Sequence, residues 1–179
     1  MDIDSKVWEV LCSKEEIQER VAELGAKISE DYAGEKIHVI ALLKGSFVFA
    51  ADLVREISVP LKISFMVTSS YGHAEHSSGD VNIEEFIKGS IEGEHILVVD
   101  DITDSGITMK KVMEHLAAKN PKSLRSCVLL DKPDRRQVEI EADYIGFEIE
   151  DKFVVGYGLN YGEYYRNIPY VFAVTNEDR

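Results

Sequence analysis

Cysteine, long apolar runs and positive charge are all scarce in this sequence. Its only two cysteines, Cys12 and Cys127, lie too far apart in sequence for the paired spacing of a zinc ribbon. Two cysteines cannot build a disulfide framework either, so a reducing compartment is favoured and we expect a cytoplasmic protein. No apolar run approaches membrane-spanning length, and the acidic N-terminal stretch lacks the apolar core of a signal peptide. We therefore expect no membrane partner.

The charge balance excludes a further class of partner. Lys and Arg together number 20, against 33 Asp and Glu, which gives a formal net charge of −13. A strongly anionic surface repels the phosphates of nucleic acids, so we expect no nucleic-acid partner. An anionic small molecule would need local positive charge, supplied by a few basic side chains, a helix N-terminus or a bound cation.

What is present is an ordinary globular composition, with 45% apolar and 30% charged residues in 179, and it predicts one domain over residues 1–179. Short apolar runs rich in β-branched residues alternate with segments of helical periodicity. This alternation predicts an α/β fold with a mainly parallel sheet flanked by helices. We expect strands at residues 36–43, 61–68, 81–88, 95–100, 126–130, 144–147, 153–157 and 170–174.

Three segments have the apolar spacing of amphipathic helices. The first follows Ser13 and Glu16, whose spacing is that of a capping box. The second and third cover residues 47–57 and 109–119. In the second helix we expect four apolar residues to point inward: Phe47, Ala50, Val54 and Ile57. Residues 69–80 are small and polar without periodicity, which predicts a long mobile loop, and loops of about this length are usually functional lids or disorder.

The strongest chemical signal follows the strand at residues 95–100. Asp100, Asp101 and Asp104 stand where this strand ends, and Ser105 and Gly106 lead into the next helix. Small residues at a helix start allow backbone N–H groups and hydroxyls to surround a phosphate. Carboxylates beside that phosphate would repel it unless they held Mg²⁺ or ribose hydroxyls. A solvated acidic turn is the alternative, but three aspartates before such a cradle favour a functional site.

Two other families contain similar strings. The string DDITD fits the aspartate-rich motif of isoprenyl diphosphate synthases, but those proteins are larger and all-helical, whereas this motif follows a β-branched strand. Response-regulator receivers also have paired aspartates and a later Lys-Pro. They need a phosphate-accepting aspartate at the end of a separate strand in between, and no aspartate stands between Asp104 and the strand at residues 126–130.

The segment 98–108 resembles the phosphoribosyl-pyrophosphate motif of type I phosphoribosyltransferases. Four further motifs, in the same order along the chain, narrow the resemblance to the hypoxanthine-guanine phosphoribosyltransferases: LLKGS at 42–46, SYG at 70–72, LDKP at 130–133 and DKFVVGY at 151–157. The resemblance covers residues 37–174. It implies the type I phosphoribosyltransferase fold, in which a small hood of short strands accompanies the central sheet.

The resemblance also implies roles for the residues of the first motif. Asp100 and Asp101 correspond to the acidic pair that holds the ribose hydroxyls and the metal, and Asp104 to the general base at purine N7. A carboxylate suits that task if burial raises its pKa toward the working pH. The resemblance assigns the cradle of the 5′-phosphate to Ser105, Gly106, Ile107 and Thr108.

The other motifs supply the pyrophosphate and purine contacts. The pyrophosphate would meet Lys44, Gly45 and Arg166, and the mobile loop that closes over the site includes Ser70 and Tyr71. The purine-binding residues implied by the resemblance are Lys132 at the 6-oxo group, Phe153 stacked on the base, Val154 through its backbone, and Asn160. Asn160 stands where the family usually has an aspartate associated with a second Mg²⁺, so the implied metal ligands are Asp100, Asp101 and Asn160.

The resemblance implies a purine-salvage enzyme. It would transfer the phosphoribosyl group of 5-phosphoribosyl 1-pyrophosphate to hypoxanthine or guanine, with Mg²⁺ required, and give IMP or GMP plus pyrophosphate. A homodimer or homotetramer is implied as well. Two alternatives remain at this point: a xanthine- or guanine-preferring relative, and a non-catalytic regulator that retained the phosphoribosyl site. Retention of Asp104, Lys44 and Lys132 argues against the regulator.

Overall fold

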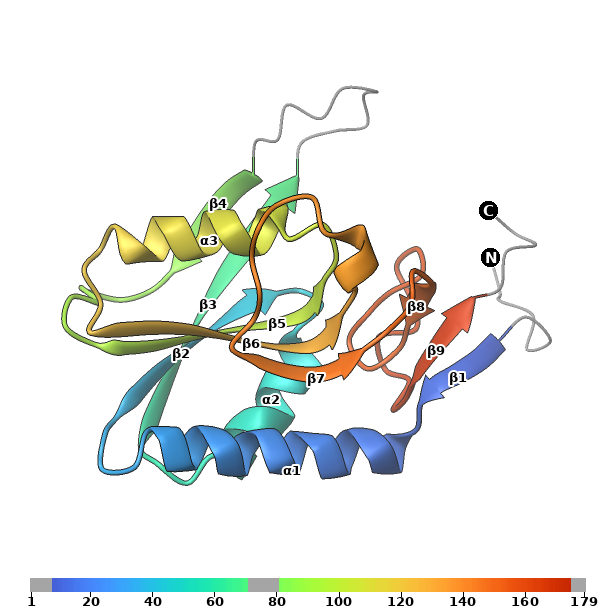
Figure 1. Cartoon of the computed structure of the whole chain (residues 1–179), viewed down its shortest axis with the longest axis horizontal. Helices are drawn as coiled ribbons and strands as arrows, with labels where there is room; N and C mark the ends of the chain where they lie inside the picture. The colour runs from blue at the N-terminus through green and yellow to red at the C-terminus, as the bar shows by residue number, and fades with distance from the viewer. Residues whose placement is uncertain (1–7, 71–80, 175–179) are drawn as a thin grey trace.

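The computed structural model describes residues 8–70 and 81–174 (Figure 1). The α-helices within these ranges are α1 (Lys14–Asp31), α2 (Phe47–Glu56) and α3 (Ile107–Ala117), and a short 3₁₀-helix, η2, spans Pro133–Arg135. The strands are β1 (Trp8–Cys12), β2 (Ile37–Leu43), β3 (Leu61–Ser70), β4 (Val81–Phe86), β5 (His95–Thr103), β6 (Ser123–Asp131), β7 (Tyr144–Glu148), β8 (Phe153–Val155) and β9 (Val171–Val174).

The central sheet has the strand order β4-β3-β2-β5-β6-β7. Strands β3, β2, β5, β6 and β7 run parallel, and only β4 pairs antiparallel, on the outer side of β3. The predicted α/β fold with a mainly parallel sheet is therefore confirmed. Because the parallel strands all end at one edge, the segments that follow β2, β5 and β6 meet there.

Helices cover both faces of this sheet, with α1 and α2 on one side and α3 on the other (Figure 1). Alternate residues of β5 serve the two layers: Leu97 and Val99 pack with the α1–α2 cluster, and Ile96 and Val98 with the α3 cluster. All four side chains are fully buried. Burial on both faces explains why this strand is a continuous apolar run and does not alternate between apolar and polar residues.

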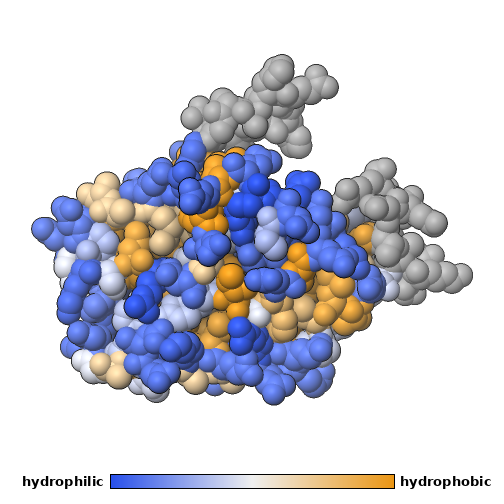
Figure 2. All heavy atoms as spheres, in the orientation of Figure 1, coloured by the Kyte–Doolittle hydropathy of each residue, from blue (hydrophilic) through white to orange (hydrophobic). Residues whose placement is uncertain are grey.

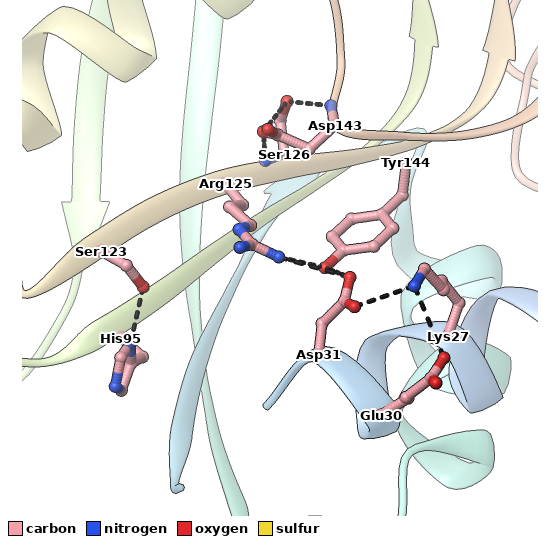
Figure 3. A network of polar contacts seen from close by, with 9 residues as sticks. All are labelled: Lys27, Glu30, Asp31, His95, Ser123, Arg125, Ser126, Asp143 and Tyr144. Carbon is pink, nitrogen blue, oxygen red and sulfur yellow. Dashed lines mark hydrogen bonds and ion pairs between the residues drawn. The ribbon is translucent and has the colours of Figure 1, made fainter. Parts of the chain in front are cut away.

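The first helix begins as its sequence predicts. The Glu16 backbone N–H donates to Ser13 Oγ at 3.2 Å, and the Ser13 N–H donates to Glu16 Oε2 at 2.7 Å, which completes the capping box. The far end of α1 is attached to the sheet by a polar network (Figure 3). In that network the Tyr144 hydroxyl donates to Asp31 Oδ2 at 2.7 Å and Arg125 Nη1 donates to the Tyr144 oxygen at 2.8 Å.

The predicted inward face of the second helix is wrong in part. Phe47 is 46% exposed, and the buried residues within α2 are Phe49, Ala50 and Leu53. The sequence FVFAADLV is apolar on more than one side of a helix, so its spacing alone does not fix which face turns inward. The packing of α2 against the sheet selects the face, and the turn before the helix is held by the Ser46 hydroxyl, which donates to the Leu42 carbonyl at 2.5 Å.

A second, three-stranded sheet with the order β1-β9-β8 forms the hood that the resemblance implied. Both pairings in it are antiparallel. Strand β1 was not predicted, since five residues at the start of the chain carry too little pattern to reveal a strand. Its Trp8 ring stacks on Phe172 of β9 with 4.4 Å between ring centroids, a contact between opposite ends of the chain.

Most of the surface seen in Figure 2 is hydrophilic, and apolar side chains show in small groups among polar ones. Among the described residues, no helix is long and apolar enough to cross a membrane. The two cysteines, Cys12 and Cys127, are both buried and form no disulfide. Burial raises the pKa of the Cys12 thiol to about 11, and its pKa is also raised, to a smaller extent, by the carboxylate of Glu16.

Candidate active site

A cavity of about 230 Å³ opens at the carboxyl-terminal edge of the parallel sheet. Three strand ends supply its walls: β2 with the turn after it, the last residues of β5 with the start of α3, and Thr68 of β3. The sequence-predicted residues that line it are Gly45, Asp100, Asp101, Asp104, Ser105, Gly106 and Thr108. The structure therefore brings together the acidic motif and the turn after β2, which are more than fifty residues apart in sequence.

The acidic pair lies within strand β5, which continues through Thr103 and does not end at Asp100 as the sequence predicts. The extra residues stay in the sheet because β6 pairs with them, Ile102 opposite Leu130 and Thr103 opposite Asp131. Consecutive strand residues point to opposite faces, so the two aspartates do not share one direction.

Burial raises the pKa of both carboxyl groups. The pKa of Asp100 is well above its ordinary value because of burial first and the neighbouring Asp101 charge second. The pKa of Asp101 is also raised by burial, while backbone hydrogen bonds and the positive charge of Arg166 act in the opposite direction. The Ile102 N–H donates to Asp101 Oδ1 at 2.9 Å. Two adjacent, half-buried carboxyl groups are a place where a divalent cation would be stabilising.

The donor set fits Mg²⁺ in particular. Within residues 8–70 and 81–174, no group of three or more His, Cys, Asp or Glu side chains is arranged to hold a metal ion. The acidic pair alone therefore offers few protein oxygens. Mg²⁺ is typically bound in this way, by one or two carboxylates together with waters and substrate phosphate oxygens.

The loop after β5 has the geometry of a phosphate cradle. Gly106 is the N-cap of α3 and has a φ of 82°, in the left-handed region that favours glycine. A Cβ at this position would also lie 2.7 Å from the Cγ2 atom of Ile140. The Ile107 N–H donates to Ser105 Oγ at 3.3 Å, so the first helical N–H groups and the hydroxyl lie together. Helix N-termini with free N–H groups bind anions.

The turn after β2 packs closely against the hood. A Cβ on Gly158, whose φ is 104°, would lie 2.2 Å from the Gly45 carbonyl oxygen. Arg166 is held beside this contact, since its Nη1 donates to the Gly158 carbonyl at 2.6 Å and its own carbonyl accepts from the Gly158 N–H at 3.0 Å. Lys44 is exposed and forms no ion pair within the part of the chain that the structure describes. Lys44 and Arg166 thus bring positive charge to the Gly45 side of the cavity.

Lys132 lies at the end of β6, beside Asp104. Its ammonium is buried, with the side chain 7% exposed, and its Nζ is 3.7 Å from Asp104 Oδ2. The Lys132 backbone N–H donates to the Thr103 carbonyl at 2.9 Å, which fixes the end of β6 against the end of β5. From the sequence, only the family resemblance predicted that Lys132 and Asp104 lie close together. In the structure, the pairing of β6 with β5 brings them together.

The hood supplies the other predicted purine contacts. Phe153 is 41% exposed at the start of β8, and its ring meets Tyr161 edge-on at 5.9 Å. Val154 is buried and pairs with Ala173 of β9. Strand β8 is at the edge of its sheet, so one side of its backbone has no strand partner among the described residues. An exposed aromatic face next to such a backbone suits a flat heterocycle.

Asn160 lies apart from the cavity lining, and the predicted mobile loop falls mostly outside the described residues. The Asn160 side-chain amide donates to the Gly162 carbonyl, and Asn160 does not line the cavity of the acidic pair. Ser70 is the last residue of β3, and Tyr71 lies outside the described residues together with the rest of the predicted loop through residue 80.

Sequence reasoning missed two arginines that lie beside Asp104, Arg135 and Arg136. Arg136 Nη1 donates to the Asp104 carbonyl at 2.7 Å, and Arg136 also pairs with Asp131. Arg135 contacts Asp104 and Asp151. The available signal was the pair of arginines directly after the Lys-Pro motif.

Comparison with known proteins defines the class. Residues 8–162 match the phosphoribosyl transferase domain family. The chain thus has the fold of a phosphoribosyltransferase and belongs to this class.

Individual relatives narrow the class to one family. The chain is 46% identical over 173 residues to a hypoxanthine phosphoribosyltransferase of Haemophilus influenzae, covering 95% of this chain and 97% of the relative. It is 47% identical over 176 residues to a hypoxanthine-guanine phosphoribosyltransferase of Aquifex aeolicus, covering 98% and 99%. A crystal structure of a hypoxanthine-guanine phosphoribosyltransferase from Bacillus anthracis matches with a TM-score of 0.88 and 47% identity, covering 93% of this chain and 98% of that one. The chain belongs to the hypoxanthine-guanine phosphoribosyltransferases, and the family identification from its five motifs is confirmed.

Proposed function

We propose that this protein is a purine-salvage transferase that moves the phosphoribosyl group of 5-phosphoribosyl 1-pyrophosphate to hypoxanthine or guanine. The bond from ribose C1′ to the pyrophosphate oxygen breaks and a bond from C1′ to purine N9 forms, which releases pyrophosphate with IMP or GMP. The observation that carries this proposal is the adjacency of three features at one sheet edge: a phosphate cradle, a half-buried acidic pair and a lysine–aspartate pair.

The phosphoribosyl end of the substrate would occupy the start of α3. Ser105, Gly106, Ile107 and Thr108 would surround the 5′-phosphate with N–H groups and hydroxyls, and Asp100 and Asp101 would accept hydrogen bonds from the ribose hydroxyls. The raised pKa of the acidic pair would fall when positive charge arrives beside it, so a cation and this pair would favour each other.

The pyrophosphate end would face the turn after β2. The Lys44 ammonium and the Gly45 backbone lie on this side, and Arg166 can offer a planar fork of donors to two oxygens. Asp100 and Asp101 would hold one Mg²⁺ and Asn160 would be a ligand of a second, and these cations would neutralise the charge of the departing pyrophosphate. Ser70 and Tyr71 belong to the loop that we propose closes over the site and excludes water.

The purine would lie between the hood and the end of β6. Phe153 would stack on the ring, the Val154 backbone would meet its edge, and Asn160 would lie near its 2-position. Lys132 would donate to the 6-oxo oxygen. Asp104 would take the proton from N7 as N9 attacks C1′, and its negative charge would also stabilise positive charge on the ribose.

Assembly, location and domain organisation belong to the same proposal. We infer a homodimer or homotetramer of single-domain chains spanning residues 1–179, working in the cytoplasm. The one central sheet shared by two hydrophobic clusters supports the single domain, and the two unpaired buried cysteines are consistent with a reducing compartment. The names of the relatives give no support to the xanthine-preferring or regulatory alternatives.

One assay tests the proposal. The protein is incubated with Mg²⁺ and 5-phosphoribosyl 1-pyrophosphate, and with hypoxanthine, guanine, xanthine or adenine in turn, and nucleotide formation is followed. We expect turnover with hypoxanthine or guanine and little with adenine. Turnover with xanthine alone would establish the first alternative, and absence of turnover with every base would establish the regulator.

A further inference from the structure

Four charged side chains form a closed ring on the purine side of the site. Lys132 Nζ is 3.7 Å from Asp104 Oδ2 and 3.8 Å from Asp151 Oδ1. Arg135 completes the ring, with Nε 3.0 Å from Asp104 Oδ1 and Nη1 3.5 Å from Asp151 Oδ2. Each cation therefore touches both carboxylates, and each carboxylate touches both cations.

Lys132 is the member of the ring that is removed from solvent. Its side chain is 7% exposed, whereas those of Asp104, Arg135 and Asp151 are 42%, 48% and 45% exposed. A buried ammonium requires compensating negative charge. Its two carboxylates, however, are both beyond the roughly 2.7–3.2 Å of an N–H···O hydrogen bond. The Lys132 ammonium thus has two carboxylates near it that balance its charge, but within the described residues it donates no hydrogen bond to either of them.

Arg135 explains why neither carboxylate moves closer to Lys132. It contacts one oxygen of Asp104 and one oxygen of Asp151, and the other oxygen of each faces the lysine. A guanidinium bridges two carboxylates with fixed donor geometry, which a lysine cannot do. Arg135 therefore holds the two acids apart on either side of the ammonium.

Asp151 ties this arrangement to the hood. It lies between β7 and β8, two residues before Phe153, whereas Asp104, Lys132 and Arg135 belong to the loops after β5 and β6. Without Asp151 the only carboxylate of the ring left to Lys132 would be Asp104, which also binds Arg135. The ammonium would then shift toward Asp104 and use its donors there.

We propose that Asp151 is a positioning residue that holds the Lys132 ammonium between two carboxylates with its donors available, and thereby sets the preference for 6-oxo purines over 6-amino purines. This inference rests on the proposed function. A free ammonium can donate to a 6-oxo oxygen, whereas a 6-amino group presents donors of its own and leaves the buried cation unpaired. Sites built for one hydrogen-bonding partner reject analogues that lack it, because polar groups are left unsatisfied.

The test compares Asp151→Asn with the wild type in two assays. Equilibrium titration with IMP and with AMP measures discrimination without turnover, and steady-state kinetics gives KM for hypoxanthine and for 5-phosphoribosyl 1-pyrophosphate. We expect the ratio of IMP to AMP affinity to fall about tenfold, KM for hypoxanthine to rise by a similar factor, and KM for the phosphoribosyl donor to change less than twofold.

Asp151→Glu should recover most of the discrimination. Asp134→Asn, an exposed carboxylate in the adjacent turn without an ion pair in the described structure, is the matched control and should change neither value.

A double variant separates positioning from a general structural effect. If Asp151 acts through Lys132, adding Asp151→Asn to Lys132→Gln should change discrimination by less than twofold beyond Lys132→Gln alone. Full additivity of the two changes would overturn the inference, as would unchanged discrimination in Asp151→Asn. A wild-type protein that neither converts hypoxanthine nor binds IMP would overturn the proposed function, and this inference with it. Normal wild-type activity with an unaltered Asp151→Asn would overturn this inference alone.

Discussion

Gly45 and Asp101 approach each other so closely that a Cβ on residue 45 would lie 1.7 Å from Asp101 Oδ2. The two residues belong to different loops at the same sheet edge, after β2 and near the end of β5, and both line the cavity. The atom in the way is the end of a side chain, so an added methyl group would displace the Asp101 carboxylate while the backbone could stay in place. The glycine thus leaves space for a carboxylate of the proposed ribose and metal site.

Gly45→Ala should therefore lower activity much more than stability. We expect kcat/KM for 5-phosphoribosyl 1-pyrophosphate to fall at least tenfold, because the displaced Asp101 would no longer meet ribose and metal. The melting temperature should change by a few degrees at most. Gly34→Ala is the control, since its φ of 82° strains an alanine but no atom within 4 Å obstructs a Cβ. The Gly34→Ala variant should lose stability and keep its activity. If Gly45→Ala instead kept its activity and Gly34→Ala lost it, the close approach of residue 45 to Asp101 would not matter for function.

Asp104→Asn should lower kcat while leaving the binding of 5-phosphoribosyl 1-pyrophosphate nearly unchanged. An amide cannot accept the N7 proton, and loss of a general base costs on the order of 10²–10⁴-fold in rate. Single-turnover rates and equilibrium binding of the donor separate the two effects. A near-normal rate in this variant would remove Asp104 from the proposed mechanism.

Lys132→Gln should weaken discrimination between hypoxanthine and adenine. Lys132 is the cation on the buried side of Asp104. The amide of a glutamine can both donate and accept hydrogen bonds, so a site with glutamine at this position would tolerate a 6-amino group. The measurement is kcat/KM for each base under identical conditions. If the ratio of the two values stays as in the wild type, another residue reads the 6-position.

Asn160→Asp should lower the Mg²⁺ concentration that gives half-maximal rate. A carboxylate attracts a divalent cation more strongly than an amide oxygen does. The Asn160 amide already donates to the Gly162 carbonyl, so the substitution also removes a local hydrogen bond and should cost about 1 kcal/mol of stability. Magnesium titrations of the two proteins at saturating substrates provide the measurement, and superimposable curves would show that residue 160 does not govern the metal.

Tyr144→Phe should lower stability at neutral pH, by about 0.5–1.5 kcal/mol for each of the two hydrogen bonds that the hydroxyl makes, one to Asp31 and one from Arg125. The Tyr144 hydroxyl, followed by Lys27, lowers the pKa of Asp31 (Figure 3). A carboxyl group whose pKa is lower in the folded state stabilises the protein above its unfolded pKa, and this contribution disappears as pH falls through the folded pKa. The difference in unfolding free energy between wild type and variant should therefore shrink in acid.

Urea unfolding at pH 7 and at successively lower pH measures this difference. Tyr170→Phe is the matched control, because the Tyr170 hydroxyl has no hydrogen bond within the described residues, and it should be neutral at every pH. A Tyr144→Phe penalty that persists unchanged below the pKa of Asp31 would show that packing, and not the hydrogen bond to the carboxylate, accounts for the loss.

The sequence by itself determined the strand–helix alternation of the central sheet, the capping box at Ser13 and the family. These features are local: periodicity, a cap four residues long, and motifs that each lie within one turn or strand end. Motif order along the chain was enough to connect Asp100, Asp101 and Asp104 with Lys132 through resemblance.

Only the tertiary structure decided which distant residues touch. The inward face of α2 was selected by packing against the sheet, and strand β1 was stabilised by pairing with β9 at the other end of the chain. The ring that joins Asp151 to Arg135 spans two loops and the hood. Such contacts leave no periodic pattern in the sequence. They arise from sheet register and loop closure, and the number of residues between two segments does not determine how close the segments lie in the fold.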